Sequence, residues 1–90
     1  DSDERERLWK EMLATGAPVA DGIDVMALSD EFSEMTGANI RNSVLAAAFL
    51  AAEEGTIIGQ SHLRRAARGE YRAMGRVLGK DHGNRNRAEL

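Results

Sequence analysis

The sequence predicts an all-α protein built from four helices. Apolar residues recur at intervals of three and four through most of the 90-residue chain, and no segment alternates apolar and polar residues with a period of two. Glycine, proline and capping residues interrupt the pattern where helices are expected to end. The length suits one small domain, because a chain of this size buries roughly 60–65% of its unfolded surface.

The first helix is expected to follow the charged opening of the chain and to end near Thr15–Gly16. Pro18 lies just beyond, which is the usual order of stop signals. The apolar face of this helix consists of Leu8, Trp9, Met12 and Leu13.

A loop over Gly16–Ile23 leads to the second helix, which Asp24 can cap. The apolar positions of this helix step by three and four residues: Val25, Leu28, Phe32 and Met35.

The third helix is predicted from about Ala38 to Glu54, with Thr36–Gly37 as its cap. It carries one apolar stripe of Ile40, Val44, Ala48 and Ala51, and a second of Leu45, Phe49 and Ala52. A helix with so much apolar surface is expected to be nearly enclosed, so we place it at the centre of the domain. Truncation of Phe49 to Ala would then cost about 3–5 kcal/mol.

Gly55 suits a left-handed stop, and Ile57 and Ile58 are expected to dock the next connection onto the core. The fourth helix is predicted from about Gln60 to Leu78. Its inward residues would be Leu63, Ala67, Tyr71, Met74 and Leu78. The domain thus covers residues 1–78, and the polar residues 79–90 are expected to form a flexible, disordered tail. The side chains expected to be well buried are Trp9, Leu45, Phe49, Leu63 and Tyr71.

The sequence contains no self-sufficient active site, and we assign no catalytic residue and no metal ligand. Cysteine is absent, and His62 and His82 lie far apart, whereas zinc sites need three or four converging ligands. The nearest match to a phosphate-binding loop, Gly75–Asp81, has the wrong glycine spacing and no Ser or Thr after its lysine. No apolar run is long enough to cross a bilayer, and no leader opens the chain, so we expect a cytoplasmic protein. The initial Asp1 suggests a fragment of a longer protein.

Charge is divided unevenly along the chain. Residues 1–59 carry 4 basic and 12 acidic side chains, a balance of −8, whereas residues 60–90 carry 8 basic and 3 acidic, a balance of +5. Arginines at intervals of four form a basic stripe on the fourth helix: Arg64, Arg68, Arg72 and Arg76. The stripe could hold phosphates, nucleic acid or an acidic protein surface, or it could be a solvated face whose stems cover apolar surface.

The segment Thr36–Asn42 offers a second possible contact point. A Thr cap followed by Gly37 and Ala38 leaves the first amides of a long helix bare. Such amides, at the positive end of the helix dipole, can contact an anion or the edge of a ligand, although many Thr–Gly helix starts are simple boundaries.

The order of these segments resembles the small helical lid domain of AAA-family ATPases, of the kind found in bacterial members. The similarity starts at the proline-led loop Pro18–Val25 and continues with the step Thr36–Ile40, which is similar to the family's Ser-Gly-Ala-Asp/Asn-Ile/Leu step. The alanine-rich stretch Arg41–Gly55 and the segment His62–Arg76 resemble the third and closing helices of the family. The resemblance covers roughly residues 5–78.

The resemblance implies a lid that closes over ATP or ADP bound to a separate α/β core domain. The core, which is absent from this sequence, would hold the Walker motifs and Mg²⁺, so the fragment alone would not hydrolyse ATP although its parent would. By the same resemblance Gly37 and Ala38 contact the nucleotide, with Asn39 adjacent. The implied partners are the core domain of the same chain and neighbouring subunits of a homo-oligomeric ring, a hexamer.

Two departures from the family pattern stand out. Relatives often carry a histidine near the ribose late in the first helix, where Met12–Leu13 stand here and offer only apolar contact. Many also have a Gly-Phe pair where Glu34–Met35 stand. The alternative function is a helical module that binds nucleic acid or acts as a protein adaptor through the arginine stripe. The acidic balance of residues 1–59 argues against nucleic acid.

Overall fold

Four α-helices make up the computed structural model, which describes the backbone of residues 1–88 and the side chains of residues 1–75. They are α1 (Ser2–Leu13), α2 (Val25–Glu31), α3 (Gly37–Glu53) and α4 (Gln60–Ala88). No strand is present among the described residues. The predicted all-α class with four helices is therefore confirmed.

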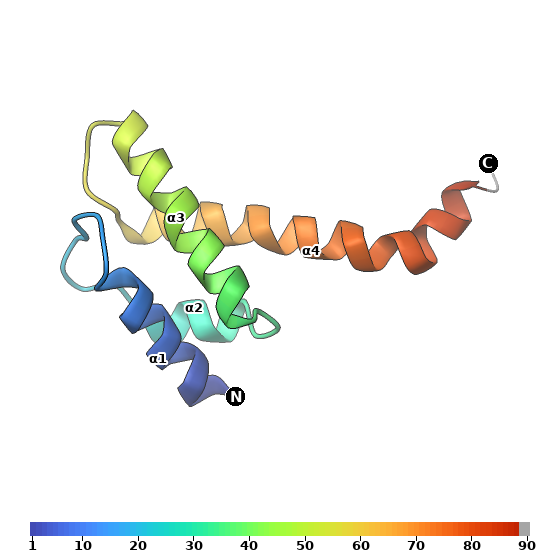
Figure 1. Ribbon diagram of the computed structural model, residues 1–90, viewed down its shortest axis with the longest axis horizontal. Coiled ribbons are helices and arrows are strands. Elements are labelled where there is room, and N and C mark those ends of the chain that lie inside the picture. Colours follow the sequence, from blue (N-terminus) through green and yellow to red (C-terminus); the bar gives the residue numbers. More distant parts are fainter. Residues whose placement is uncertain (89–90) are drawn as a thin grey trace.

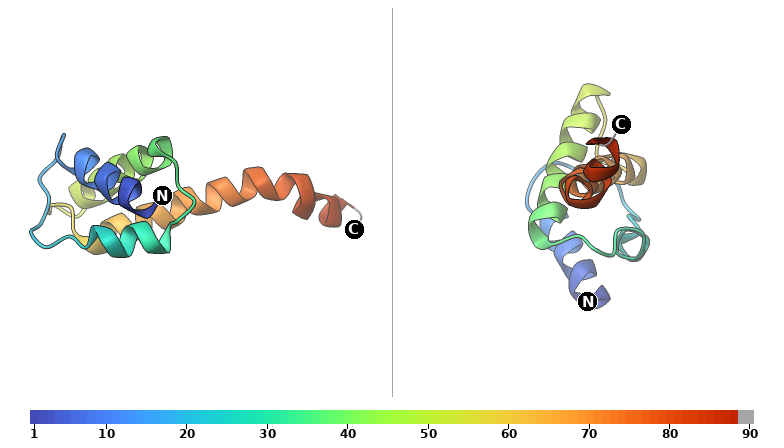
Figure 2. Two further views of the ribbon diagram at one scale, coloured as in Figure 1. Left: turned by 90° about the horizontal axis from the view of Figure 1, so that it is seen from below. Right: turned by 90° about the vertical axis from the view of Figure 1, so that its right-hand side faces the viewer.

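Packing brings α1 against α2 and α3, and α3 against α4 (Figure 1). The first part of α4 lies beside α3, and the helix then extends away from the other three helices (Figures 1 and 2). The core contains apolar residues from all four helices and from the connection before α4. Its fully enclosed large side chains are Trp9, Leu28, Ile40, Ile58 and Leu63.

Local capping follows the sequence signals. The N–H of Ala27 donates to Oδ1 of Asp24 at 2.9 Å, which caps α2. Gly55 has a φ of +70°, so it ends α3 in the left-handed conformation that glycine adopts without steric cost.

Two sets of hydrogen bonds also join segments that are distant in the sequence. The side-chain amide of Gln60 accepts the N–H of Asp24 at 2.8 Å and donates to its carbonyl at 3.1 Å, which ties the start of α4 to the start of α2. Ile58 donates to the carbonyl of Pro18 at 3.0 Å and accepts the N–H of Ala20 at 2.8 Å. This short parallel bridge joins the connection between α1 and α2 to the connection between α3 and α4.

The expectation that α3 is enclosed on all sides is wrong. Leu45 and Phe49, expected to be buried, are 58% and 67% exposed. The buried face of α3 consists instead of smaller residues, Ile40, Ser43, Ala47 and Ala51. Small side chains allow α4 to pack close to α3, and no element of the described chain covers the opposite face.

Three more side chains were expected to be well buried, and two of them are. Trp9 and Leu63 are fully buried, as predicted. Tyr71 is only half-buried, because its ring contacts Phe32 edge-on while its hydroxyl reaches the surface and accepts the N–H of Glu34 at 3.3 Å.

The fourth helix is longer than predicted. Its backbone continues past Leu78, the expected end, to Ala88. The added stretch contains no proline, and a polar composition alone does not stop a helix. The side chains of residues 76–90, including the inward position expected for Leu78, lie outside the described residues. The flexible tail over 79–90 stays a prediction.

Candidate functional site

The start of α3 is held by a reciprocal cap. The N–H of Asn39 donates to Oγ1 of Thr36 at 3.2 Å, and the N–H of Thr36 donates to Oδ1 of Asn39 at 2.9 Å. Gly37 and Ala38 lie between these two residues as the first helical positions, where an N–H has no carbonyl acceptor within the helix. The cap therefore fixes the backbone while leaving two N–H groups directed out of the helix end.

The side chains at this helix start are small and open to approach. Ala38 is exposed, and Gly37 is half-buried beside Leu8 of α1. A Cβ built on Gly37 would lie 3.8 Å from Cδ1 of Leu8, an ordinary van der Waals distance. Internal packing thus leaves room for a methyl group at Gly37 and does not itself demand a glycine there.

Asn39 has a different role from its two neighbours. Its Nδ2 donates to Oε2 of Glu70 at 2.9 Å, and Nδ2 of Asn42 donates to the same oxygen at 3.2 Å. With its Oδ1 used in the cap, both polar atoms of the Asn39 side chain have partners within the chain. Asn39 positions the start of α3 relative to α4.

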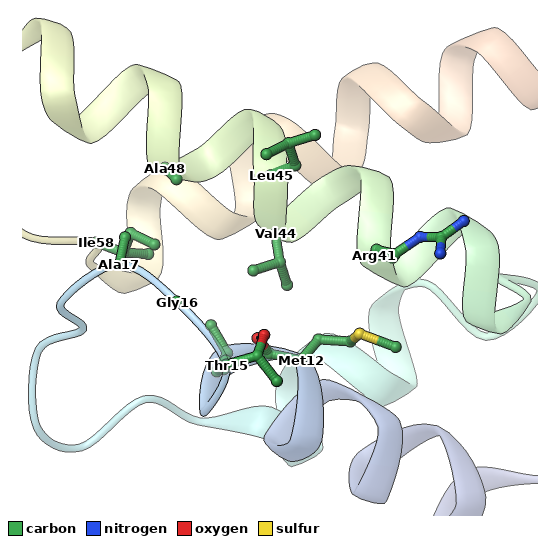
Figure 3. Close-up of a pocket in the computed structure, with 10 residues that line it drawn as sticks. Met12, Thr15, Gly16, Ala17, Arg41, Val44, Leu45, Ala48 and Ile58 are labelled. Carbon is green, nitrogen blue, oxygen red and sulfur yellow. The ribbon is translucent and has the colours of Figure 1, made fainter.

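A groove with mostly apolar walls lies between α1 and α3 (Figure 3). Its α3 wall begins at Arg41, about one turn after Gly37, and the residues from Gly37 to Asn39 do not line it. Its volume is about 260 Å³. Met12 and Leu13 of α1 line one wall. The opposite wall comes from α3 through Arg41, Val44, Leu45 and Ala48. No pattern in the sequence points directly to this groove, because its walls come from segments that are far apart in the chain.

Two of the four arginines of the basic stripe, Arg64 and Arg68, pair with one acidic side chain of the same chain. Arg64 binds Glu31 through two hydrogen bonds, of 3.1 and 3.3 Å, and Arg68 lies 3.7 Å from the same carboxylate. Arg65 donates to Glu54 at 3.1 Å. The side chain of Arg76 lies outside the described residues. These pairs link α4 to α2 and to the end of α3, which favours a structural role for the first half of the stripe.

Among the residues that the structure describes, no group of three or more His, Cys, Asp or Glu side chains could hold a metal ion. No helix there combines the length and the apolar character needed to cross a membrane.

Comparison of the chain with protein-family models and with curated proteins finds no match.

Proposed function

We propose that this chain is the helical lid of an AAA ATPase, which closes over ATP or ADP bound to a separate α/β core domain. The observation that carries the proposal is the start of α3, where small residues and unpaired helical N–H groups face outward at Gly37 and Ala38. A flat purine can approach such a helix start closely, since neither Gly37 nor Ala38 carries a side chain larger than a methyl group.

Two neighbouring features support a nucleotide at this position. The Thr36–Asn39 cap and the bonds to Glu70 hold the two residues in one backbone geometry, so binding requires little reordering. The adjacent groove offers Met12 and Leu13 for apolar contact with a base or ribose. In this proposal Gly37 and Ala38 contact the nucleotide, and Asn39 positions them.

The lid performs no catalysis alone. The phosphates and Mg²⁺ belong to the core domain, and the rigid bundle transmits changes in nucleotide state to a neighbouring subunit of a ring. A gene that encodes this chain should therefore encode G-x-x-x-x-G-K-[ST] on the order of 120–150 residues upstream, about one domain's length. A complete gene without that motif would contradict the proposal.

A pair of matched substitutions tests the site within the full-length protein. Ala38→Glu places a bulky side chain where the base or ribose would lie, so we expect nucleotide binding to weaken at least about tenfold through steric exclusion. Ala46→Glu changes another exposed alanine of α3 and should leave the affinity unchanged. Isothermal titration with ADP measures both, and unchanged affinity in Ala38→Glu would remove Gly37 and Ala38 from the site.

A further inference from the structure

An exposed ridge runs along the face of α3 that points away from the core. It consists of four residues at intervals of four, Arg41, Leu45, Phe49 and Glu53, and each of them is exposed. Residues at this interval line up as one ridge of a helix and can enter the groove of another helix. Among the ion pairs of residues 1–75, none involves the Arg41 guanidinium or the Glu53 carboxylate.

Two copies of this ridge that run in opposite directions have complementary charges and matching apolar residues. Positions 41 and 53 are both six residues from Ala47, and positions 45 and 49 are both two residues from it. An antiparallel second copy related by a two-fold axis that crosses the ridge midway between Leu45 and Phe49 therefore sets Arg41 opposite Glu53 and Leu45 opposite Phe49. Each of these pairs forms twice, as a two-fold interface requires.

The groove beside the ridge offers apolar walls to a second ridge. Arg41 and Leu45 form one edge of it, Val44 and Ala48 the next row of α3, and α1 the far wall (Figure 3). In the antiparallel arrangement Phe49 of the second copy faces these apolar walls. The Glu53 carboxylate of the second copy, one turn after its Phe49, then lies at the Arg41 end of the groove, opposite a positive charge.

We propose that this chain forms a two-fold symmetric dimer through the Arg41–Glu53 ridge of α3. A second copy is the occupant that the pattern selects, because the reversed sequence of the same helix matches both the apolar centre and the opposite charges at the two ends. The proposal goes beyond the lid function and requires neither nucleotide nor a core domain. A second copy in this groove would exclude a base or ribose from Met12 and Leu13, so the dimer is a state of the nucleotide-free chain. An interface of one helix ridge with its groove is small, so the dimer is weak and depends on concentration.

Sedimentation equilibrium of the 90-residue chain from about 10 μM to about 1 mM measures this association. We expect a monomer–dimer equilibrium, and Phe49→Ser should raise the dimer Kd at least about tenfold because the loss acts twice across the axis. Met26→Ser is the matched control, since Met26 is 59% exposed but lies on α2. The melting temperature of dilute protein should stay unchanged in both variants, which shows that they remain folded.

A charge-reversal cycle tests the register. Arg41→Glu and Glu53→Arg each place like charges opposite one another at both ends of the interface, so each should weaken the dimer. The double variant restores opposite charges and should recover the original Kd. Both changes suit the dipole of α3, with a carboxylate near its start and a guanidinium near its end, so the helix stays intact. A monomer over the whole concentration range, a dimer insensitive to Phe49→Ser, or a double variant as weak as the single ones would overturn the proposal.

Discussion

His62 lies with Nε2 2.8 Å from Oε1 of Glu54, while its Nδ1 accepts the N–H of Gly59 at 2.9 Å. Because Nδ1 is an acceptor, the proton of the neutral imidazole resides on Nε2 and is donated to the carboxylate. Arg65 donates to the other oxygen of Glu54 at 3.1 Å. The buried imidazole thus joins the end of α3 to the start of α4.

Acid should destabilise the folded chain partly through Glu54. The hydrogen bond from His62, followed by that from Arg65, holds the pKa of Glu54 below its ordinary value of 4.5. A carboxyl whose pKa is lowered on folding stabilises the folded state above its unfolded pKa, and this stabilisation is lost as the pH falls through the folded pKa. We expect Glu54→Gln to flatten the fall in melting temperature between about pH 5 and about pH 3. Circular dichroism measures the slope, with Glu53→Gln as the neighbouring control; equal slopes in all three proteins would contradict this role.

Loss of the His62 side chain should reduce stability more than its position at the edge of the core suggests. His62→Ala leaves the N–H of Gly59 without its acceptor and opens a space beneath α4, so we expect a loss of about 1–3 kcal/mol. A glutamine at this third helical position can reach back to the same N–H, as in a capping box, and His62→Gln should therefore lose less. Urea unfolding compares the two variants, and equal losses would show that the hydrogen bond to Gly59 is unimportant.

The two faces of α3 should respond very differently to truncation. Phe49 is exposed, so Phe49→Ala should change the free energy of unfolding by no more than about 0.5 kcal/mol in dilute solution. Ile40 is fully buried on the opposite face, and Ile40→Ala should cost about 2–5 kcal/mol. Thermal unfolding at low protein concentration measures both, and a larger loss for Phe49→Ala would restore the enclosed helix that the sequence predicts.

The basic stripe should not support binding to nucleic acid. Arg64 and Arg68 of the stripe already pair with Glu31, so a phosphate backbone that binds these two arginines would have to break these contacts. We expect no measurable binding to duplex DNA at about 50 mM salt. Fluorescence anisotropy tests this, and binding that weakens steeply with added salt would favour the nucleic-acid module instead.

Helix positions were predictable because each depends on neighbours in the sequence. Asp24 and Thr36 cap the helices that they were expected to cap, and Gly55 adopts the left-handed stop. These signals act over one turn of helix, so they need no knowledge of the tertiary fold.

The burial of α3 could not be decided in the same way. Leu45 and Phe49 form an apolar stripe as convincing as the one around Ile40, and single-sequence periodicity does not say which stripe meets another helix. The structure buries the side rich in alanine, because that side permits the closest approach of α4. Contacts between distant segments, such as Asn39 with Glu70, were likewise invisible, since polar residues at these positions also suit a solvated surface.

The main-chain bridge between Ile58 and the Pro18–Ala20 segment has a consequence for how the molecule opens. Its two hydrogen bonds involve only backbone atoms, so they persist through nearly any change of side chain in either connection. The α1–α2 connection cannot detach without releasing the α3–α4 connection, although the bonded residues are almost forty positions apart in the sequence. Amide hydrogen exchange at Ala20 and Ile58 should therefore proceed at matching rates, as one cooperative unit.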